Sequence, residues 1–221
     1  MTLLLRTEVG SHMWRMNRPD SDHDYFKVYL GSTRHILLGG FFRSIQKRDE
    51  LGKLDQSCHE LGVTVEKLIK GNINFIIGVN SPLCQFVHPD IALFRESPAP
   101  YLTKEIGDSL FGMVHNNIGK YGRKEPDDSP RWSKLMRILK LGEALAASCE
   151  LRFEPVGVVW YDHLLEELRR IRSLFYSSTI LPDAPPSGVQ EVMRDLVVDL
   201  RVKQLCVEEI SRGRDSSTDR L

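Results

Sequence analysis

Two short segments near the start of the chain contain residues whose types and spacing suit phosphate and metal chemistry. Gly10-Ser11 ends a short apolar run, and Asp22-His23-Asp24 follows after ten intervening residues. A glycine lets the backbone approach a ligand closely, and Ser11 offers a hydroxyl and an amide to an anionic group. A helical turn after Ser11 would add its N-terminal dipole. The first segment therefore predicts a phosphate-binding turn.

The two aspartates are separated by one residue at the start of an expected strand. Alternate residues of a strand share a face, so Asp22 and Asp24 are expected to point the same way. Two carboxylates this close repel each other unless a cation lies between them. Mg²⁺ favours a site of one or two carboxylates completed by substrate phosphate oxygens. We therefore expect Mg²⁺, or Mn²⁺ in its place, at Asp22 and Asp24.

This arrangement resembles the nucleotidyltransferases of the DNA polymerase β superfamily, whose signature is Gly-Ser, a loop and an Asp-x-Asp strand. Its spacing is similar to that of the small minimal nucleotidyltransferases. The longer string Gly10-Ser11-His12-Met13-Trp14, followed by Pro19-Asp20-Ser21-Asp22-His23-Asp24, resembles a predicted group associated with RNA repair. The chain departs from that group's pattern at Arg15, where glycine is common, which bears on the shape of the turn.

The resemblance implies a third carboxylate from a neighbouring strand, completing a site for two metal ions about 4 Å apart. We choose Asp55, because Glu60-Leu61 and Gly71-Asn72 follow it in the order that the RNA-repair-like group shows. The alternatives for this third position are Glu60, Glu66 and Asp90.

The same resemblance implies a role for each site residue. Asp22, Asp24 and Asp55 would bind the metals, and Asp55 would help to draw the proton from the acceptor. Gly10 and Ser11 would hold the terminal phosphates of the nucleotide.

Basic residues beside the aspartates have two interpretations. Arg15, Arg18 and Lys27 either pair with triphosphate oxygens, as arginine does through its forked guanidinium, or balance nearby acidic residues at the surface. We assign Arg15 and Arg18 to nucleotide binding. The stretch Arg169-Arg170-Ile171-Arg172 is either an RNA-binding patch or, because Glu166 and Glu167 interrupt it, a solvated helix face.

The histidines and Trp14 have plainer interpretations. No two of His12, His23 and His59 share the i, i+4 spacing of a helical zinc pair, and we interpret them as surface or turn histidines. Trp14 either stacks on a nucleobase or, as we favour, belongs to the core. In the C-terminal half, Lys134 and Arg137 resemble the helical region of the RNA-repair-like group.

The remaining sequence indicates the elements that position these residues. Apolar runs at 3–9 and 25–30 predict strands, the first of them buried on both faces. Residues 58–70 predict a helix, residues 74–79 favour another strand, and residues 81–103, with four prolines, are expected to be a connector. Helical spacing predicts further helices over 106–118, 132–148, 161–176 and 189–211.

These elements predict an α/β (α+β) protein with a small mixed sheet followed by helices. We expect a polymerase β-like nucleotidyltransferase domain over residues 1–95, a helical domain over 96–211 and a flexible tail over 212–221. The site is expected at the sheet edge, facing the helical part.

Composition excludes little. Among 221 residues, 30 Lys plus Arg balance 30 Asp plus Glu, so net charge indicates neither a nucleic acid nor a membrane partner. Four scattered cysteines without a CxxC pair argue against a zinc knuckle or a disulfide framework. No apolar run approaches the roughly 20 residues of a membrane span. A cytoplasmic protein without membrane contact is expected.

Three classes of function follow. The first is transfer of a nucleoside monophosphate from an NTP, most simply ATP, to an acceptor hydroxyl, with an RNA or tRNA end favoured. The second is adenylylation of a protein or small molecule, as in toxin–antitoxin pairs. The third is a non-catalytic nucleotide-sensing or partner-binding module. Any of the three is compatible with an oligomer.

Overall fold

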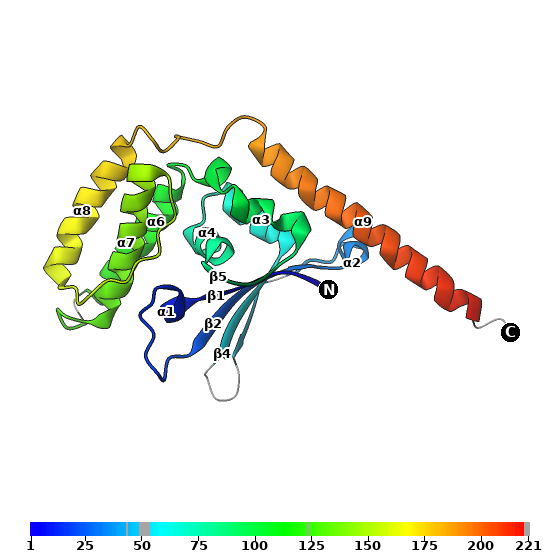
Figure 1. Cartoon of the computed structure of the whole chain (residues 1–221), viewed down its shortest axis with the longest axis horizontal. Helices are drawn as coiled ribbons and strands as arrows, with labels where there is room; N and C mark the ends of the chain where they lie inside the picture. Colours follow the sequence, from blue (N-terminus) through cyan, green and yellow to red (C-terminus); the bar gives the residue numbers. More distant parts are fainter. Residues whose placement is uncertain (43, 49–53, 123, 219–221) are drawn as a thin grey trace.

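A computed structural model describes residues 1–42, 44–48, 54–122 and 124–218, with side chains through residue 210. The strands within these ranges form one sheet in the spatial order β3-β4-β2-β1-β5 (Figure 1). They are β1 (Thr2–Val9), β2 (His23–Leu30), β3 (Ile45–Arg48), β4 (Leu54–Glu60) and β5 (Leu83–Val87). Strands β2 and β4 are parallel, and the other neighbours are antiparallel. This mixed sheet, followed by helices, confirms the predicted fold class.

The strand β1 lies between β2 and the edge strand β5. Its pairing with β2 shifts register between Leu3 and Leu5, and Leu4 and Leu5 are both buried although they are consecutive. A bulge changes which way side chains point, which explains an apolar run that lacks simple alternation. Further along, the hydroxyl of Thr7 donates to the carbonyl oxygen of Gly78 at 2.6 Å and ties the strand to a covering helix.

Two helices cover one face of the sheet. The first, α3 (Leu61–Ile69), begins where the Glu60 carboxylate accepts a hydrogen bond from the Gly62 amide at 2.7 Å. The second, α4 (Ile73–Asn80), is capped by Asn72, whose side chain accepts from two amides of the first turn. An unpaired N-terminal amide is costly when buried, so these caps fix where each helix starts.

Three predictions in this region differ from the structure. The strand predicted at 74–79 is the helix α4, because a short apolar run buried on nearly every side has no periodicity that separates helix from strand. The helix predicted at 58–70 begins only at Leu61, since Cys58 still belongs to β4.

The expected connector at 81–103 includes β5, which pairs with β1, and three short helical segments. These are η1 (Pro89–Ile91), α5 (Leu93–Glu96) and η2 (Ala99–Tyr101).

Three helices form a group beside the sheet. They are α6 (Ile106–Tyr121), α7 (Pro130–Ser148) and α8 (Tyr161–Ser177), close to the helices predicted at 106–118, 132–148 and 161–176. Trp132, Leu139 and Phe175 are completely buried among them. Residues 149–160 return along α7, where the Ser133 hydroxyl donates to the Gly157 carbonyl at 2.8 Å. This packing presents one face of α7 towards the sheet.

The last helix, α9 (Val189–Thr218), crosses α3 and α2 (Thr33–Leu37), and its C-terminal part projects from the body (Figure 1). It continues to Thr218, seven residues into the segment expected to be a tail, and residues 219–221 lie outside the described residues. No helix of the described chain combines the length and the apolar character needed to cross a bilayer.

One ion pair fixes α9 to the sheet. The Arg201 guanidinium donates to Glu60 Oε1 at 2.7 Å, and the Glu60 side chain is only 4% exposed. Replacing Arg201 with Met should lower the free energy of unfolding by about 3 kcal/mol, because it leaves a buried carboxylate without its cation. Urea unfolding measures this.

Glu60→Gln/Arg201→Met provides the matched control, because it removes the buried charge together with its cation. It should recover part of the lost stability. Equal stability of Arg201→Met and the wild type would contradict this account of how α9 is held.

Candidate active site

The three predicted carboxylates gather at one end of β2 and β4. Asp24 and Asp55 are paired residues on these parallel strands, and Asp22 lies in the loop that enters β2. Burial, followed by the charges of Asp22 and Asp55, raises the pKa of Asp24, while Lys134 and Arg48 act in the opposite direction. The Arg48 Nε donates to Asp55 Oδ2 at 3.1 Å. The cluster therefore concentrates negative charge at the sheet edge.

The turn between β1 and α1 (Gly10–Met13) brings the backbone against this cluster. Gly10 adopts a φ of +68°, and a Cβ at this position would lie 2.0 Å from Asp24 Oδ2. No other residue type fits there without moving the carboxylate. Ser11 follows at the start of the helical turn. The sequence predicts that the Gly10 backbone lies close to a ligand. In the structure, the group that it lies close to is the Asp24 carboxylate.

Arg15, where the chain departs from the RNA-repair-like pattern, ends this helical turn. Arg15 has a φ of 55°, and its amide donates to the His12 carbonyl while the Met16 amide donates to the Ser11 carbonyl, each at 3.0 Å. This pair of bonds is a Schellman motif, whose left-handed residue is usually glycine. The turn keeps its shape with arginine there, at a cost of about 1 kcal/mol.

A basic cavity of about 570 Å³ lies between this turn and α7. Ser11, Arg18 and Asp22 line its sheet side, and Lys134 and Arg137 line its helix side. Arg137 is 6% exposed, and its Nε and Nη1 meet no hydrogen-bond acceptor among the described residues. A buried, unpaired guanidinium is costly in an isolated protein, so the cavity is suited to an anion.

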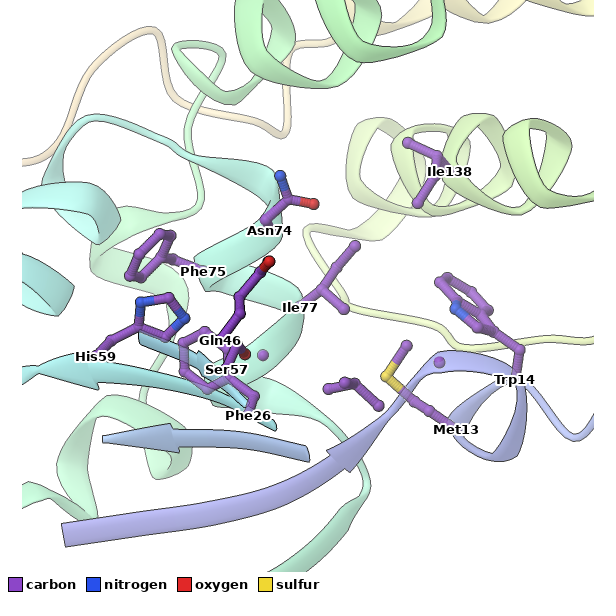
Figure 2. A pocket seen from close by; sticks show the side chains of 13 residues that line it. Met13, Trp14, Phe26, Gln46, Ser57, His59, Asn74, Phe75, Ile77 and Ile138 are labelled. Carbon is purple, nitrogen blue, oxygen red and sulfur yellow. The ribbon is translucent and has the colours of Figure 1, made fainter. Parts of the chain in front are cut away.

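A second cavity, of about 540 Å³, lies on the other side of Gly10. Figure 2 shows aromatic and aliphatic side chains around it from β2, β4, α4 and α7. Trp14 is buried as we favour, packs on Phe153 at 5.2 Å and also borders this cavity. The walls are suited to a flat apolar group.

His59 also lines the second cavity and is not a surface histidine. Its ring packs on Phe26 and Phe75, with centroids 4.7 and 4.6 Å away. Burial lowers the pKa of His59 to about 4, so the imidazole is neutral at neutral pH. Sequence periodicity gave no signal for this environment, because it depends on the α4 helix that the sequence pattern does not identify.

Other predicted residues lie elsewhere. Lys27 points to the opposite face of the sheet and donates to Gln56 at 2.6 Å, and Arg15 is exposed at the turn. Glu60 and Glu66 pair with Arg201 and Arg194. The remaining alternative acid, Asp90, lies 3.6 Å from His88 in η1.

The basic stretch on α8 has acidic neighbours. Arg170 is ion-paired with Glu143 and Glu167, and the Glu167 carboxylate also accepts from Lys140 at 2.8 Å. Because of these ion pairs, we interpret Arg170 as part of a solvated helix face.

The low pKa of His59 predicts that the stability of the folded protein depends on pH. Between pH 6.5 and about 4 the unfolded chain binds a proton at His59 that the native protein excludes, so stability falls as pH falls through this window. His59→Phe should lose less stability than the wild type between about pH 7 and about pH 5, measured by urea unfolding. His163→Phe, at an exposed position on α8, should behave as the wild type. Identical pH profiles for wild type and His59→Phe would contradict the buried neutral imidazole.

Comparison with known proteins places most of the chain in a known family. The model of the family described as RlaP, RNA repair pathway DNA polymerase beta family, matches residues 1–177. The match spans the sheet, both cavities and the helical group, and it ends at the last residue of α8. None of the curated proteins matches the chain. Because the match covers most of the 221 residues, the chain belongs to the RNA repair pathway DNA polymerase beta family.

Proposed function

We propose that this protein is a metal-dependent nucleotidyltransferase that moves a nucleoside monophosphate from an NTP, most simply ATP, to an acceptor hydroxyl. The observation that supports this best is the pairing of Asp24 with Asp55 beside the Gly10-Ser11 turn. Membership of a polymerase beta family is consistent with the same chemistry.

The acidic cluster fits a divalent cation. Asp24 has two carboxylate neighbours that raise its pKa, and among the described residues the one direct ion pair of the cluster joins Asp55 to Arg48, whose side chain is mostly exposed. Hard cations such as Mg²⁺ or Mn²⁺ prefer such oxygen ligands. Asp22, Asp24 and Asp55 would therefore hold the metal, which when bound neutralises phosphate charge and makes the acceptor hydroxyl more acidic.

The chain's own residues then orient the reactants. The triphosphate occupies the basic cavity, with Ser11 and the Gly10 backbone on one side and Arg18, Lys134 and Arg137 around it. The acceptor oxygen forms a bond to the α-phosphorus as the bond to the β-phosphate oxygen breaks. Pyrophosphate leaves, and the acceptor proton passes towards Asp55. Arginine at a phosphate contributes mainly to positioning and charge stabilisation.

The favoured acceptor is an RNA or tRNA end, as the family description suggests. One observation favours a smaller or protein acceptor instead: Arg170, at the centre of the basic stretch on α8, is already paired with Glu143 and Glu167. The acceptor pool of the assay below separates these candidates.

The first test is a transfer assay with each α-labelled NTP, Mg²⁺ or Mn²⁺, and a pool of tRNA, nicked RNA and cell lysate. Asp24→Asn should reduce transfer by at least about a hundredfold, since a metal ligand is worth several kcal/mol in the transition state. In metal-free buffer the same variant should unfold at a higher temperature, because a half-buried carboxylate that Asp22 and Asp55 repel is neutralised.

The two readouts separate loss of chemistry from loss of fold. Label that moves equally well with the wild type and Asp24→Asn would exclude this site. Tight nucleotide binding by the wild type without any transfer or metal dependence would favour the sensing module.

The basic cavity gives a second test. Arg137→Met keeps the length of the side chain beside Trp14 but removes the charge. It should weaken NTP binding by roughly tenfold or more while leaving stability equal or higher, because an unpaired buried charge disappears. Isothermal titration and thermal unfolding measure the two effects.

Arg131→Met is the matched control on the same helix. Arg131 pairs with Glu125 and lies over the Tyr121 ring, and it does not line the basic cavity. Equal NTP affinities of the two variants would place the phosphates elsewhere.

A further inference from the structure

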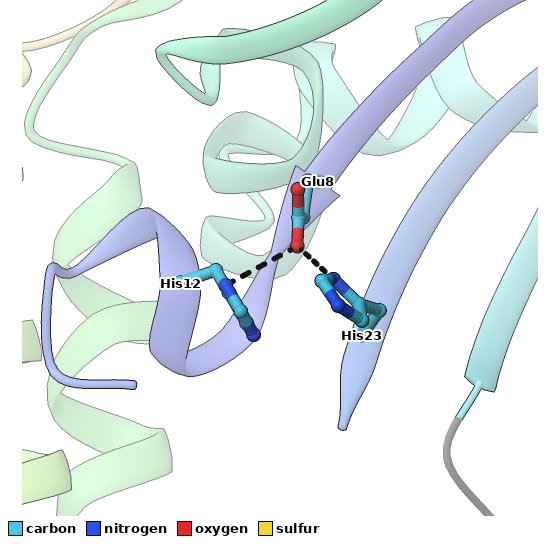
Figure 3. A group of neighbouring side chains, drawn as sticks. All are labelled: Glu8, His12 and His23. Carbon is cyan, nitrogen blue, oxygen red and sulfur yellow. Dashed lines mark hydrogen bonds and ion pairs between the residues drawn. The ribbon is translucent and has the colours of Figure 1, made fainter. Parts of the chain in front are cut away.

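A group of side chains that could hold a metal ion lies on the opposite face of the sheet from the aspartates. Figure 3 shows Glu8 at the end of β1, His12 on α1 and His23 at the start of β2, directed towards one another. One ligand atom from each residue lies within 4.8 Å of the other two. The three come from separate elements, with Glu8 and His12 four residues apart in the sequence and His23 brought beside them by the pairing of β1 with β2.

Among the described residues, His12 stacks on the His23 ring with centroids 4.3 Å apart but makes no side-chain hydrogen bond. Its Nδ1 lies 3.6 Å from Glu8 Oε1, too far for a hydrogen bond, and its Nε2 is buried with no partner among the described residues. The side chain is only 18% exposed. A largely buried imidazole whose nitrogens are both unbonded is unusual, because buried polar atoms normally find partners.

The spacing suits a tetrahedral ion. Ligands at about 2.1 Å from zinc lie about 3.4 Å apart at tetrahedral angles, close to the separation of His12 Nδ1 and Glu8 Oε1. His23 Nδ1 is 2.6 Å from the same oxygen and would have to move by roughly 0.8 Å to share an ion with it. The His23 side chain is half exposed, and its ring stacks on the His12 ring with centroids 4.3 Å apart, so binding an ion would require the two rings to turn relative to each other.

The side chains of Glu8, His12 and His23 favour a different class of cation from the class that the aspartates favour. Two imidazoles and one carboxylate suit zinc and its neighbours in the first transition row, whereas carboxylates alone suit Mg²⁺ or Mn²⁺. We propose that Glu8, His12 and His23 form a Zn²⁺ site that fastens β1, α1 and β2 to one another. This site does not depend on the proposed nucleotide transfer.

The position of the triad gives the bound ion a structural role. His12 is the residue after Ser11, and His23 lies between Asp22 and Asp24. An ion held here joins the phosphate-binding turn to the strand of the catalytic aspartates. Binding to the native state alone also stabilises it by mass action.

The test is a Zn²⁺ titration of the chelator-treated full chain by calorimetry, in buffer with excess Mg²⁺, together with absorption spectra of the Co²⁺-loaded protein. The wild type should bind a single equivalent of Zn²⁺, show the strong visible bands of tetrahedral Co²⁺ and unfold at a higher temperature with Zn²⁺. Glu8→Gln, His12→Ala and His23→Ala should each weaken Zn²⁺ binding by at least about tenfold.

Two control variants locate the ion. His163→Ala, at an exposed position on α8, and Asp22→Asn/Asp24→Asn should both retain wild-type Zn²⁺ affinity. Thermal unfolding in chelator verifies that every variant is folded. If a histidine variant does not fold, Glu8→Gln still tests the site, because it preserves the volume and polarity of the side chain. No Zn²⁺ binding by the wild type, undiminished binding by folded triad variants, or binding lost only with the aspartates would each overturn the proposal.

Discussion

The carboxylate of Asp24 is held against the Gly10 backbone and beside the carboxylates of Asp22 and Asp55, and the surrounding fold is organised around that crowding. Parallel pairing of β2 with β4 places Asp24 and Asp55 side by side. In a folded protein without a cation this arrangement is unfavourable, because burial and like charges both oppose ionisation. The three carboxylates stay close together because packing away from the site fixes the strands β2 and β4.

That packing comes from elements remote from the site. Phe26 on β2 and His59 on β4 are covered by Phe75 of α4, and the Glu60–Arg201 pair fixes the far end of β4. On the other side of the turn, α7 carries the opposite charge, since Arg137 is buried there and its Nε and Nη1 have no acceptor among the described residues. Under the proposed function, a triphosphate with its cation would match both halves, and the same ligand would offset each unfavourable feature.

Sequence reasoning succeeds where the information is local. Gly10, Ser11, Asp22 and Asp24 lie within fifteen residues of one another, and a turn followed by a strand is sufficient to bring them together. It is weaker for residues whose position depends on long-range pairing. The register that places Asp55 beside Asp24 is set by a crossover connection, and the burial of Arg137 depends on how α7 meets the sheet. Residues 74–79 mislead because burial on every side removes the periodicity on which prediction depends.

The alternation of a β-strand explains how one short segment can serve two kinds of cation. Successive side chains of β2 point to opposite faces, so Asp24 faces α7 while His23 faces Glu8 on the other side. Carboxylates favour hard cations, and imidazoles favour borderline ones. Because the protein backbone separates the two sets, an ion at the proposed Glu8–His12–His23 site would stiffen the turn without competing for the aspartates. The proposed zinc site would then limit the flexibility of the turn on one face, and the proposed transfer would take place on the other.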